Sequence, residues 1–364
     1  MRAKSSIKVA FFIPQIGGGG AERVVANLVN QFAQDNVNVI LITKDKRPNE
    51  YKIEEGVSRF CLTKKEEKGN RLQRTFKHLI NLRRICKDNA IDVLVSFNVP
   101  ANYLAIWALL GSKTKHIISV RNAPDFLFKT TLEKILAKFL FSLADGAVFQ
   151  TKDAQEWFPY KLRRKAVIIY NPVHSQFYNI KHEPLPFRVV TCGRLTKQKN
   201  HKMLINAFKY VVEQFPKAEL HIYGEGNLGK ELANLIEKTG LKNNVFLEGR
   251  VENVSSVLSA ATLFVLSSDV EGAPNALMEA MAVGVPSVST DCPCGGPRML
   301  LHESKAGLLV QVDNKELMSK AILQLLSSRE LLCDMGKNAK KEACKFKEEE
   351  IYKLWLNYTN TVIS

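Results

Sequence analysis

The fold of this chain is decided by the stretch Thr262-Leu-Phe-Val-Leu-Ser-Ser-Asp-Val-Glu-Gly-Ala-Pro-Asn-Ala-Leu-Met-Glu279. Its apolar run 263–266 is typical of a strand that is buried on both faces, as in a parallel sheet. Gly272 and Ala273 then fit a turn, and Pro274 suits the first helical position, where its missing N–H has no cost. The sequence therefore predicts a buried strand, a turn and a helix start in immediate succession.

The expected helix start is a candidate binding site between two carboxylates. Backbone N–H groups near Asn275 and Ala276 have no intrahelical acceptor, so they attract an anion. Glu271 lies just outside the helix and Glu279 lies further along it. A ligand made of a sugar, a diphosphate and a ribose would meet Glu271 at one end, the amides in the middle and Glu279 at the other. Taken alone, the two glutamates also fit the solvated face of a surface helix.

Length and composition predict a soluble protein of two domains. At 364 residues the chain exceeds one ordinary hydrophobic core. No apolar run approaches the roughly 18 residues that span a bilayer. The first residues lead directly into an expected strand, so we expect no signal peptide. The seven cysteines are scattered and indicate ordinary thiols rather than disulfides or a metal site. A cytoplasmic protein fits these observations.

Positive charge is concentrated in the first half of the chain. Residues 1–180 contain 29 Lys and Arg against 15 Asp and Glu, whereas the remaining residues contain 23 against 21. The net charge of +16 therefore comes almost entirely from the first half. Such asymmetry predicts an anionic partner, which is a membrane surface, a phosphorylated acceptor or nucleic acid.

Apolar runs alternate with amphipathic stretches along both halves, which is typical of parallel sheets covered by helices. The alternation breaks at Asn171-Pro-Val-His174 and stays irregular as far as Pro186. The expected strands are 7–13, 37–43, 92–97, 116–120, 146–150 and 167–170 in the first half, and 188–192, 219–223, 245–247, 263–267, 286–289 and 307–309 in the second.

The pattern predicts an α/β fold of two doubly wound, Rossmann-like domains with a cleft between them. We expect an N-terminal domain over 1–173, a linker over 174–187 and a C-terminal domain over 188–346. A helix over 347–364, with Trp355 on its apolar side, is expected to pack back on the N-terminal domain. Ligands of such sheets bind outside the carboxyl ends of the strands, so the loops at those ends are the informative ones.

Several of these loops carry glycines or cations. The turn Gly17–Gly20 lets the backbone approach an anion at a helix start, although a flexible turn is an equal alternative. Arg194 can chelate phosphate oxygens and Lys199 adds a compact charge, whereas a solvated basic loop is the alternative for both. Tyr223-Gly-Glu-Gly226 and Glu248-Gly-Arg-Val251 fit either the rim of a nucleobase site or plain turns.

Five motifs carry a resemblance to a known family. They are the Gly-rich first loop, G-R-L-x-x-x-K at 193–199, G-E-G at 224–226, E-G-x-x-N-x-L-x-E-A-M from Glu271 and D-C-x-x-G-G-P-R at 291–298. Together they resemble glycosyltransferase family four, whose members are retaining, nucleotide-sugar-dependent enzymes of the GT-B fold. The resemblance covers almost the whole chain and is strongest between Val189 and Arg298. It identifies the family and not the sugar.

The resemblance implies a role for each matching residue. Arg194 and Lys199 would hold the donor diphosphate and stabilise the leaving group. Glu271 would contact the hydroxyls of the donor sugar, with a nucleophilic role ranked below that, and these three are the expected catalytic residues. The family usually needs no divalent metal or other cofactor, because cations and a helix N-terminus take the developing charge. The expected donor-binding residues are Gly18, Gly19, Arg194, Lys199, Gly224, Arg250, Val251, Glu271, Ala273, Asn275, Ala276 and Glu279, with Gly18 and Gly19 over the diphosphate and Glu279 on the ribose.

The loop that follows strand 116–120 departs from the family pattern. Many relatives have a histidine there, whereas this chain has Arg121 and Asn122. These two residues, with Asn98 at the end of another strand, are the candidate acceptor-binding residues. His116 lies within its strand, where a packed core histidine is the preferred interpretation.

Two stretches of the first half combine cations with apolar residues at helical spacing. Residues 70–87 place apolar side chains at 72, 76, 79, 80 and 82, with Lys64, Lys65 and Lys68 just before them, and residues 125–141 form the second stretch. An ordinary packed helix is the alternative for each. Two such stretches in a basic half favour contact with an anionic membrane surface.

The resemblance implies transfer of a hexose or N-acetylhexosamine, with retention, to a lipid-linked oligosaccharide or lipopolysaccharide acceptor in bacterial surface-glycan synthesis. The donor is expected to be UDP-linked, and the protein to lie peripherally on the inner face of the plasma membrane. A nucleotide-sugar epimerase of the GT-B fold is one alternative. A basic nucleic-acid-binding protein is another, although no nucleic-acid module or stacking platform is recognisable, so we expect no nucleic-acid partner.

Overall fold

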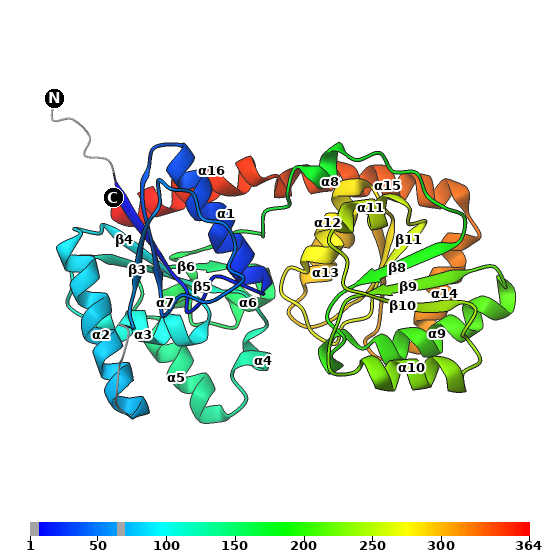
Figure 1. The fold of residues 1–364 in the computed structure, drawn as a ribbon, viewed down its shortest axis with the longest axis horizontal. Coiled ribbons are helices and arrows are strands. Elements are labelled where there is room, and N and C mark those ends of the chain that lie inside the picture. Colours follow the sequence, from blue (N-terminus) through cyan, green and yellow to red (C-terminus); the bar gives the residue numbers. More distant parts are fainter. Residues whose placement is uncertain (1–6, 64–69) are drawn as a thin grey trace. The chain divides into compact units, whose positions relative to one another are not determined.

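The computed structural model describes residues 7–63 and 70–364 of this protein. The chain forms two compact units (Figure 1). Unit 1 comprises Met1–Asn171 and Glu349–Ser364, and unit 2 comprises Pro172–Glu348. Residues 1–6, for which no signal peptide was expected, and the lysines at 64, 65 and 68 lie outside the described residues.

Unit 1 is built on a parallel sheet of seven strands in the order β3-β2-β1-β4-β5-β6-β7. The strand order reverses between β1 and β4, so the carboxyl ends of these two strands flank the topological switch point of the sheet. The strands are β1 (Lys8–Phe12), β2 (Asn38–Thr43), β3 (Ser58–Cys61), β4 (Val93–Phe97), β5 (Lys115–Val120), β6 (Gly146–Phe149) and β7 (Ala166–Ile168).

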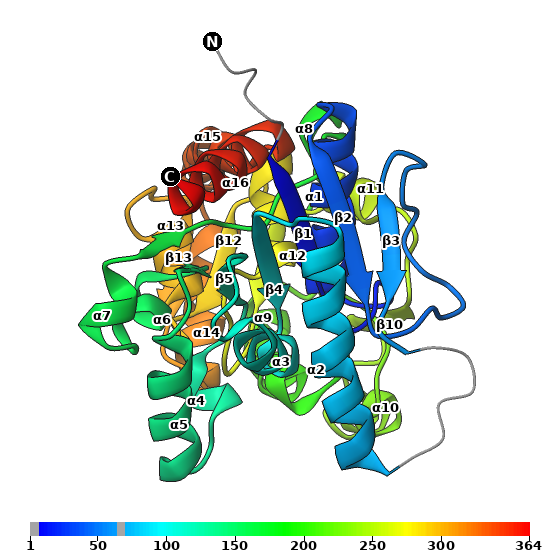
Figure 2. The same ribbon diagram turned by 90° about the vertical axis from the view of Figure 1, so that its left-hand side faces the viewer.

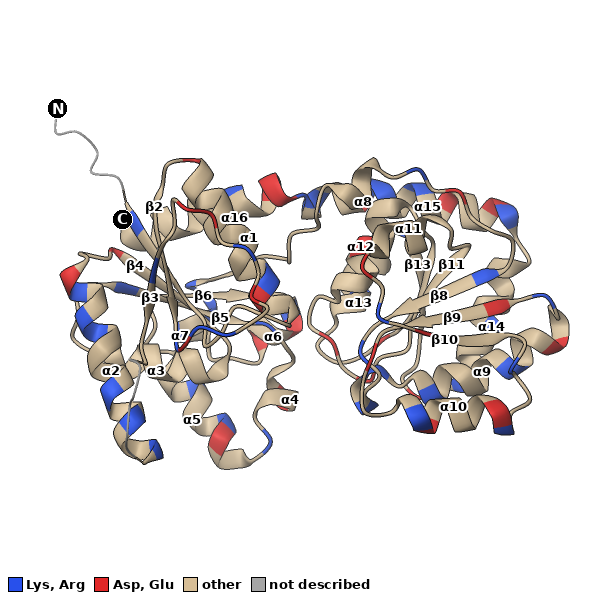
Figure 3. Cartoon of the chain, in the orientation of Figure 1, with Lys and Arg blue, Asp and Glu red and all other residues tan. Residues whose placement is uncertain are grey.

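Helices cover both faces of this sheet (Figure 2). Successive residues of β1 point to opposite faces: Val9 and Phe11 pack with α1 and α16, whereas Ala10 and Phe12 pack with α2 and α3. Lys and Arg recur along α2 (Figure 3). The helices of unit 1 are α1 (Gly20–Gln34), α2 (Arg71–Asp88), α3 (Val99–Leu109), α4 (Pro124–Leu127), α5 (Thr131–Phe141), α6 (Lys152–Glu156), α7 (Tyr160–Arg163) and α16 (Glu348–Ile363).

The last helix, α16, belongs to unit 1 for nearly its whole length. Trp355 is fully buried, with its ring centroid 6.3 Å from that of Phe11 and 5.6 Å from that of Phe97. The Tyr358 hydroxyl accepts a hydrogen bond of 2.8 Å from the backbone N–H of Ala147 in β6. Aromatic packing and one buried hydrogen bond therefore fix α16 against the first sheet.

Unit 2 contains a parallel sheet of six strands in the order β10-β9-β8-β11-β12-β13, with its switch point between β8 and β11. The strands are β8 (Arg188–Cys192), β9 (Glu219–Tyr223), β10 (Val245–Gly249), β11 (Leu263–Leu266), β12 (Ser287–Thr290) and β13 (Gly307–Val310). The helices are α8 (Gln176–Asn179), α9 (His201–Gln214), α10 (Gly229–Lys238), α11 (Val254–Ser259), α12 (Asn275–Val283), α13 (Gly296–Leu301), α14 (Lys315–Leu326) and α15 (Arg329–Ala343), with 3-10 turns at Lys197–Lys199 and Cys344–Phe346.

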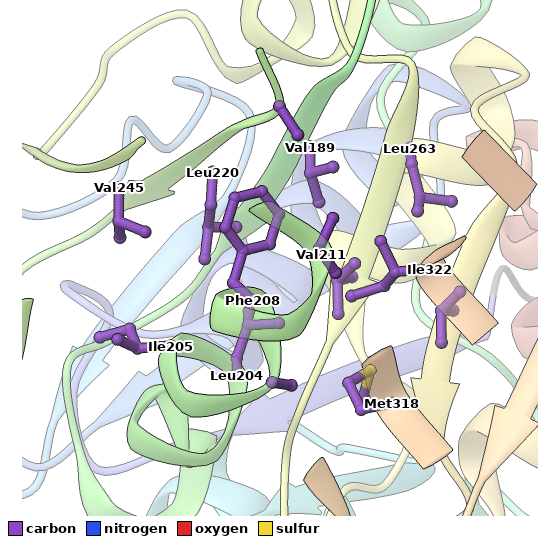
Figure 4. Close-up of a cluster of buried hydrophobic side chains, with 14 of the residues drawn as sticks. Val189, Leu204, Ile205, Phe208, Val211, Leu220, Val245, Leu263, Met318 and Ile322 are labelled. Atoms are coloured by element: carbon purple, nitrogen blue, oxygen red, sulfur yellow. The ribbon is translucent and has the colours of Figure 1, made fainter. Parts of the chain in front are cut away.

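The core of unit 2 lies between its sheet and helices α9, α10 and α14 (Figure 4). Phe208 of α9 is fully buried among Val189, Leu220 and Leu263 from three neighbouring strands. Met318 and Ile322 of α14 complete this side of the core. Burial of large apolar side chains on the face of a parallel sheet supplies most of the stabilisation expected for such a layer.

The predicted fold class is confirmed, because both sheets are parallel and flanked by helices. The expected linker 174–187 contains α8 and is part of unit 2. Strand β3 and helix α3 in unit 1, and helices α14 and α15 in unit 2, were not predicted from the sequence. Within the described residues, the helices are too short or too polar to serve as a membrane span.

Candidate active site

The centre of the candidate site in unit 2 is an ion pair between two loops that flank the switch point. Lys199 follows β8 and Glu271 follows β11, and Lys199 Nζ lies 2.5 Å from Glu271 Oε1. The Ser268 hydroxyl donates a second hydrogen bond of 2.7 Å to the same oxygen. The two charged side chains are only 17% and 11% exposed. The structure thus brings together two of the three predicted catalytic residues.

Backbone contacts fix the spacing of these two loops. The hydroxyl of Ser267 donates to the carbonyl oxygen of Lys199 at 2.8 Å. The N–H of Asp269 donates to the carbonyl of Gln198 at 2.8 Å, and the Gln198 side chain donates to the carbonyl of Val270 at 2.9 Å. Because each contact joins the two loops, the distance between Lys199 and residue 271 is set before any ligand binds.

The start of α12 lies one residue later than expected, at Asn275, with Pro274 just before the helix. The first helical bond runs from the N–H of Met278 to the carbonyl of Pro274, so the preceding helical N–H groups lack a partner within the helix. The loop after β12 presses on this turn, since a Cβ built on Gly296 would lie 1.6 Å from the carbonyl oxygen of Gly272. The predicted residues Ala273 and Ala276 lie in this turn and in the first turn of α12.

Glu279 is buried within α12, with 6% of its surface exposed. Burial and the nearby Glu279 carboxylate both raise the pKa of the Cys192 thiol, whereas Lys199 lowers it. Cys192 ends β8, so Glu279 and Lys199 act on the same point of the sheet edge. A second thiol, that of the buried Cys292, has its pKa raised to about 12 by burial and by Glu271.

Three loops at the carboxyl ends of β8, β9 and β10 interlock. The N–H of Gly193 donates to the carbonyl of Tyr223 at 2.9 Å, and the N–H of Gly224 donates to the carbonyl of Gly249 at 2.8 Å. Gly224 has a φ of 139°, and a Cβ there would lie 2.0 Å from the carbonyl oxygen of Gly193, so only glycine fits. These loops carry Arg194 and Arg250, both exposed, and half-buried Val251.

The glycine-rich loop of unit 1 forms the entry to α1, at the switch point of the first sheet. Gly18 has a φ of 81°, and Gly19 precedes the helix in an extended conformation. The hydroxyl of Tyr51 donates to the carbonyl of Gly19 at 3.3 Å. The Glu22 side chain approaches Gly19 closely enough to obstruct any Cβ there. Gly18 is therefore required for its backbone conformation, whereas a Cβ at Gly19 would have to displace the end of the Glu22 side chain.

The three candidate acceptor residues lie at the carboxyl ends of β4 and β5. Asn98 precedes α3 with a φ of 74°, the left-handed region that asparagine tolerates better than most residues. Asn122 accepts a hydrogen bond of 2.9 Å from the N–H of Ala123. Arg121 lies beside them, with its guanidinium carbon 5.6 Å from the ring centroid of Phe97. Neighbouring parallel strands thus place all three at one sheet edge.

Arg121 is a half-buried cation, and its hydrogen-bond partners among the described residues of unit 1 are neutral. It donates to the side-chain oxygen of Asn171 and, at 3.5 Å, to the hydroxyl of Ser119. Its buried Nε has no hydrogen-bond partner. Burial lowers the pKa of the guanidinium to about 9. A desolvated cation without a carboxylate is a favourable place for an anionic ligand.

Two family models match this chain. The model described as "Glycosyltransferase Family 4" matches residues 18–177, and the model described as "Glycosyl transferases group 1" matches residues 176–342. The chain belongs to glycosyltransferase family four. The resemblance predicted from the motifs is confirmed, and this family-four enzyme is a glycosyltransferase.

Named relatives agree with this assignment. An uncharacterized glycosyltransferase of Methanocaldococcus jannaschii is 34% identical over 257 residues, which are 63% of this chain and 62% of the relative, so the chain spans less than two thirds of that protein. The N-acetylgalactosamine-N,N'-diacetylbacillosaminyl-diphospho-undecaprenol 4-alpha-N-acetylgalactosaminyltransferase of Campylobacter jejuni is 29% identical over 96% of this chain and 99% of its own length. Neither the epimerase nor the nucleic-acid alternative is favoured by these matches.

Solved structures confirm the GT-B fold of the family-four enzyme. The HepE protein of Anabaena, crystallised with UDP, has a TM-score of 0.81 over 98% of this chain and 100% of its own, at 17% identity. The lipopolysaccharide outer core galactosyltransferase WaaB has a TM-score of 0.78 over 98% of this chain and 99% of its own, at 19% identity. At these identities the likeness concerns the fold alone.

Three residues that hold the predicted site residues in place were not predicted from the sequence. Ser268 and Gln198 orient the Lys199–Glu271 pair, and Asn171 orients Arg121. The position of Ser268 directly after a buried strand was a usable signal, because polar residues at strand ends face ligands in such sheets. Asn171 gave no such signal, since it occurs where the strand pattern breaks.

His116 is a core residue in this family-four enzyme. It is 4% exposed, and its Nε2 lies 2.8 Å from the hydroxyl of Ser96. Burial lowers its pKa to about 4, so it is neutral at physiological pH. Across residues 7–63 and 70–364, we find no group of three or more His, Cys, Asp and Glu side chains placed to hold a metal ion.

Proposed function

We propose that this enzyme transfers a hexose or N-acetylhexosamine from a UDP-sugar, with retention of anomeric configuration, to a lipid-linked oligosaccharide or lipopolysaccharide acceptor. The observation that carries the proposal is the Lys199–Glu271 pair at the switch point of unit 2, beside the start of α12. The pair places a cation that can bind a diphosphate next to a carboxylate that can accept hydrogen bonds from sugar hydroxyls. The Campylobacter relatives named as N-acetylgalactosaminyltransferases on diphospho-undecaprenol glycans, and the UDP bound by HepE, support the choice of substrates.

Unit 2 is the donor-binding unit in this proposal. Arg194 and Lys199 bind the diphosphate together with the first N–H groups of α12, at Asn275 and Ala276. Glu279, buried beside the end of β8, accepts hydrogen bonds from the ribose hydroxyls. The interlocked loops around Gly224, Arg250 and Val251 receive the nucleobase, and the amide of Ala273 lies close to the sugar. We also assign Gly18 and Gly19, in the turn before α1 of unit 1, to binding of the diphosphate.

The proposed reaction breaks the bond between the anomeric carbon and the phosphate oxygen of the donor. The acceptor hydroxyl attacks the same face of the sugar, and its proton passes to the departing phosphate oxygen. Lys199 and Arg194 stabilise the negative charge that grows on the diphosphate, and Glu271 orients the sugar through its hydroxyls. Because cations and a helix start provide this stabilisation, the proposed chemistry requires neither a divalent metal nor an organic cofactor.

Unit 1 is the acceptor-binding unit in this proposal. Arg121 has buried donor groups and no described carboxylate partner, so we assign it to an anionic group of the acceptor. Asn98 and Asn122 lie at the same edge of the sheet and offer amide groups to acceptor hydroxyls. In the loop after β5, Arg121 and Asn122 stand where many relatives have a histidine.

We further propose that unit 1 docks on an anionic membrane, as a peripheral protein of the inner face of the bacterial plasma membrane. Helices α2, α3 and α5 lie side by side (Figure 2). All three carry large apolar side chains that are exposed. We call this surface the apolar face, which comprises Leu72, Phe76, Ile80, Trp107, Leu110, Leu132, Ile135, Leu136, Phe139 and Leu143. Apolar side chains that face water beside basic ones fit the boundary between lipid headgroups and acyl chains.

A donor screen tests the reaction. UDP- and GDP-sugars are compared for the rise in melting temperature of the full chain, since a bound donor stabilises by mass action. The stabilising donor is then incubated with and without an undecaprenyl-diphosphate glycan, and the product linkage is determined by NMR. We expect stabilisation by a UDP-sugar and an α-linked product only when the acceptor is present. Conversion of the donor sugar without an acceptor would refute transfer.

A further inference from the structure

A second candidate binding site lies in unit 1, among residues that the reaction has not used. A cavity of about 530 Å³ opens between the carboxyl ends of β1, β2 and β3 and the first turns of α2 and α3. We call it the α2 pocket, and its main lining residues are Phe12, Lys44, Leu62, Arg71, Arg74 and Leu104. Ligand pockets typically measure about 300–1,000 Å³, and in doubly wound sheets they lie at this edge.

The rim of the α2 pocket is cationic. Lys44, Arg71 and Arg74 are exposed, and within the described part of the chain they form no ion pair with a carboxylate. Asp45 is the one acidic side chain among the described lining residues, and it lies 3.3 Å from Arg47. Arg71 and Arg74 are three residues apart on one helix, so their guanidinium groups share one face. Two such forks suit the oxygens of neighbouring phosphate groups.

The floor of the α2 pocket is apolar. Phe12, Leu62 and Ala101 are at most 2% exposed, and Leu104 completes the wall. A free inorganic anion would gain nothing from such a floor, whereas a hydrocarbon group attached to the anion would be removed from water. The combination therefore favours an amphiphilic phosphate ester over a simple ion.

The outer side of α2 continues this apolar character. Leu72, Phe76 and Ile80 are spaced four residues apart, and each is at least half exposed. They belong to the same helix whose first turns, at Arg71 and Arg74, line the pocket. Helix α2 therefore lines the pocket with one side and presents apolar side chains to the surroundings on the other.

We propose that the α2 pocket binds the diphosphate and the first isoprenoid units of the acceptor lipid. Arg71, Arg74 and Lys44 hold the phosphates, and Phe12, Leu62 and Leu104 contact the hydrocarbon. This inference rests on the proposed function, in which the acceptor is lipid-linked. It adds a lipid-diphosphate site to the candidate acceptor residues at the ends of β4 and β5.

Isothermal titration of the full chain with farnesyl diphosphate, a short isoprenyl diphosphate, tests the inference. The wild-type protein is expected to bind it, and the Arg71→Ala/Arg74→Ala variant at least roughly tenfold more weakly, the effect of losing one charge-assisted contact. Thr75→Trp, which fills the pocket from an exposed helical position, is expected to abolish binding. The matched control Arg84→Ala/Lys87→Ala removes the same charge from the other end of α2 and is expected to retain binding.

Inorganic pyrophosphate and UDP are titrated in parallel. Binding of pyrophosphate as tightly as farnesyl diphosphate would overturn the lipid assignment, because the apolar floor would then contribute nothing. An equal loss of farnesyl diphosphate affinity in the Arg84→Ala/Lys87→Ala control would also overturn it. So would a loss of that affinity in Arg121→Met with none in Arg71→Ala/Arg74→Ala.

The titrations also separate this inference from the proposed function. If the wild type binds UDP and not farnesyl diphosphate, this inference fails and glycosyl transfer stands. If farnesyl diphosphate binds as expected and UDP does not, the α2 pocket stands and the donor assignment fails.

Discussion

Lys199 and Glu271 depend on each other for charge as well as for position. Each has lost most of its hydration, and the second hydrogen bond from Ser268 completes the shell of the carboxylate. A bound diphosphate would compete with Glu271 for the Lys199 ammonium. We therefore expect donor binding to free the Glu271 carboxylate to accept hydrogen bonds from the hydroxyls of the sugar. In the free enzyme, the ion pair keeps both side chains in the positions that donor binding requires.

Replacing Lys199 by alanine is expected to impair both activity and stability. Loss of a preorganised positive charge should lower kcat about 10²- to 10³-fold and weaken donor binding. The carboxylate of Glu271 would lose its cationic partner, which should cost about 1–3 kcal/mol of unfolding free energy. Steady-state kinetics with the stabilising donor and urea unfolding measure the two effects.

The controls for Lys199→Ala separate charge from position. Lys197 is exposed on the same 3-10 turn, so Lys197→Ala should change both measurements little. Adding Glu271→Gln to Lys199→Ala should restore stability, because the unpaired charge is removed, without restoring activity. Near-normal turnover in Lys199→Ala would refute the site assignment.

The partly buried guanidinium of Arg121 is expected to destabilise the folded protein and to bind an anionic group of the acceptor. Its cation is partly desolvated and its partners are neutral, so replacement by the similarly shaped Met should leave the unfolding free energy unchanged or raise it by about 1 kcal/mol. The same change should raise the KM for the acceptor at least roughly tenfold and leave the KM for the donor unaltered. A large loss of stability with normal acceptor kinetics would show that Arg121 is structural.

At the scale of elements, the candidate site is built where loops from neighbouring strands interlock. The sequence predicted the strand β11, the turn after it and the helix α12, because an apolar run, glycine and proline mark each in turn. Pro274 was placed one residue too deep in the helix, since a proline before the first turn and one within it leave the same pattern. The contact between Gly272 and Gly296 could not be predicted from the sequence, because it joins two loops that are distant along the chain.

Other elements were missed for a physical reason. Helix α3 is apolar on nearly all sides, so it has no period that distinguishes it from a buried strand. The short edge strand β3 reads Ser-Arg-Phe-Cys and carries little hydrophobic signal. Tertiary packing, rather than local pattern, decides both elements.

The packing of Gly296 against Gly272 predicts how a substitution at Gly296 affects the turn before α12. In Gly296→Ala the new methyl group would overlap the carbonyl oxygen of Gly272, so the turn before α12 must move. We expect a loss of about 1–3 kcal/mol in unfolding free energy and weaker donor binding. Gly229→Ala is the control, because a Cβ there meets only Leu195 at 3.7 Å, and it should be neutral in both measurements. Equal donor affinity in the two variants would contradict this role of the loop.

At the scale of the whole molecule, charge and apolar surface coincide in unit 1. The sequence predicted basic, amphipathic helices, but hydrophobic periodicity does not reveal which side of a helix is buried. In α2, Leu82 and Cys86 face the core, whereas Leu72 and Phe76 face outward. In α5 the periodic apolar side chains are mostly exposed, and small or neighbouring residues such as Ala137 are buried instead. Helices that look like ordinary packed helices in sequence thus contribute an outward apolar surface.

Docking of the apolar face on a membrane predicts two separable contributions to binding. Ile135 and Phe139 are 61% and 65% exposed on α5, so Ile135→Ser/Phe139→Ser should lower partition into phosphatidylglycerol vesicles at least roughly tenfold. Leu354→Ser, which changes an exposed apolar residue of α16, is the matched control and should bind normally. Raising the ionic strength should weaken wild-type binding through screening, and the residual binding in salt should depend on Ile135 and Phe139. Sedimentation with vesicles measures all four cases. Absence of wild-type binding at low salt would refute docking, and full binding of the α5 variant would assign it to charge alone.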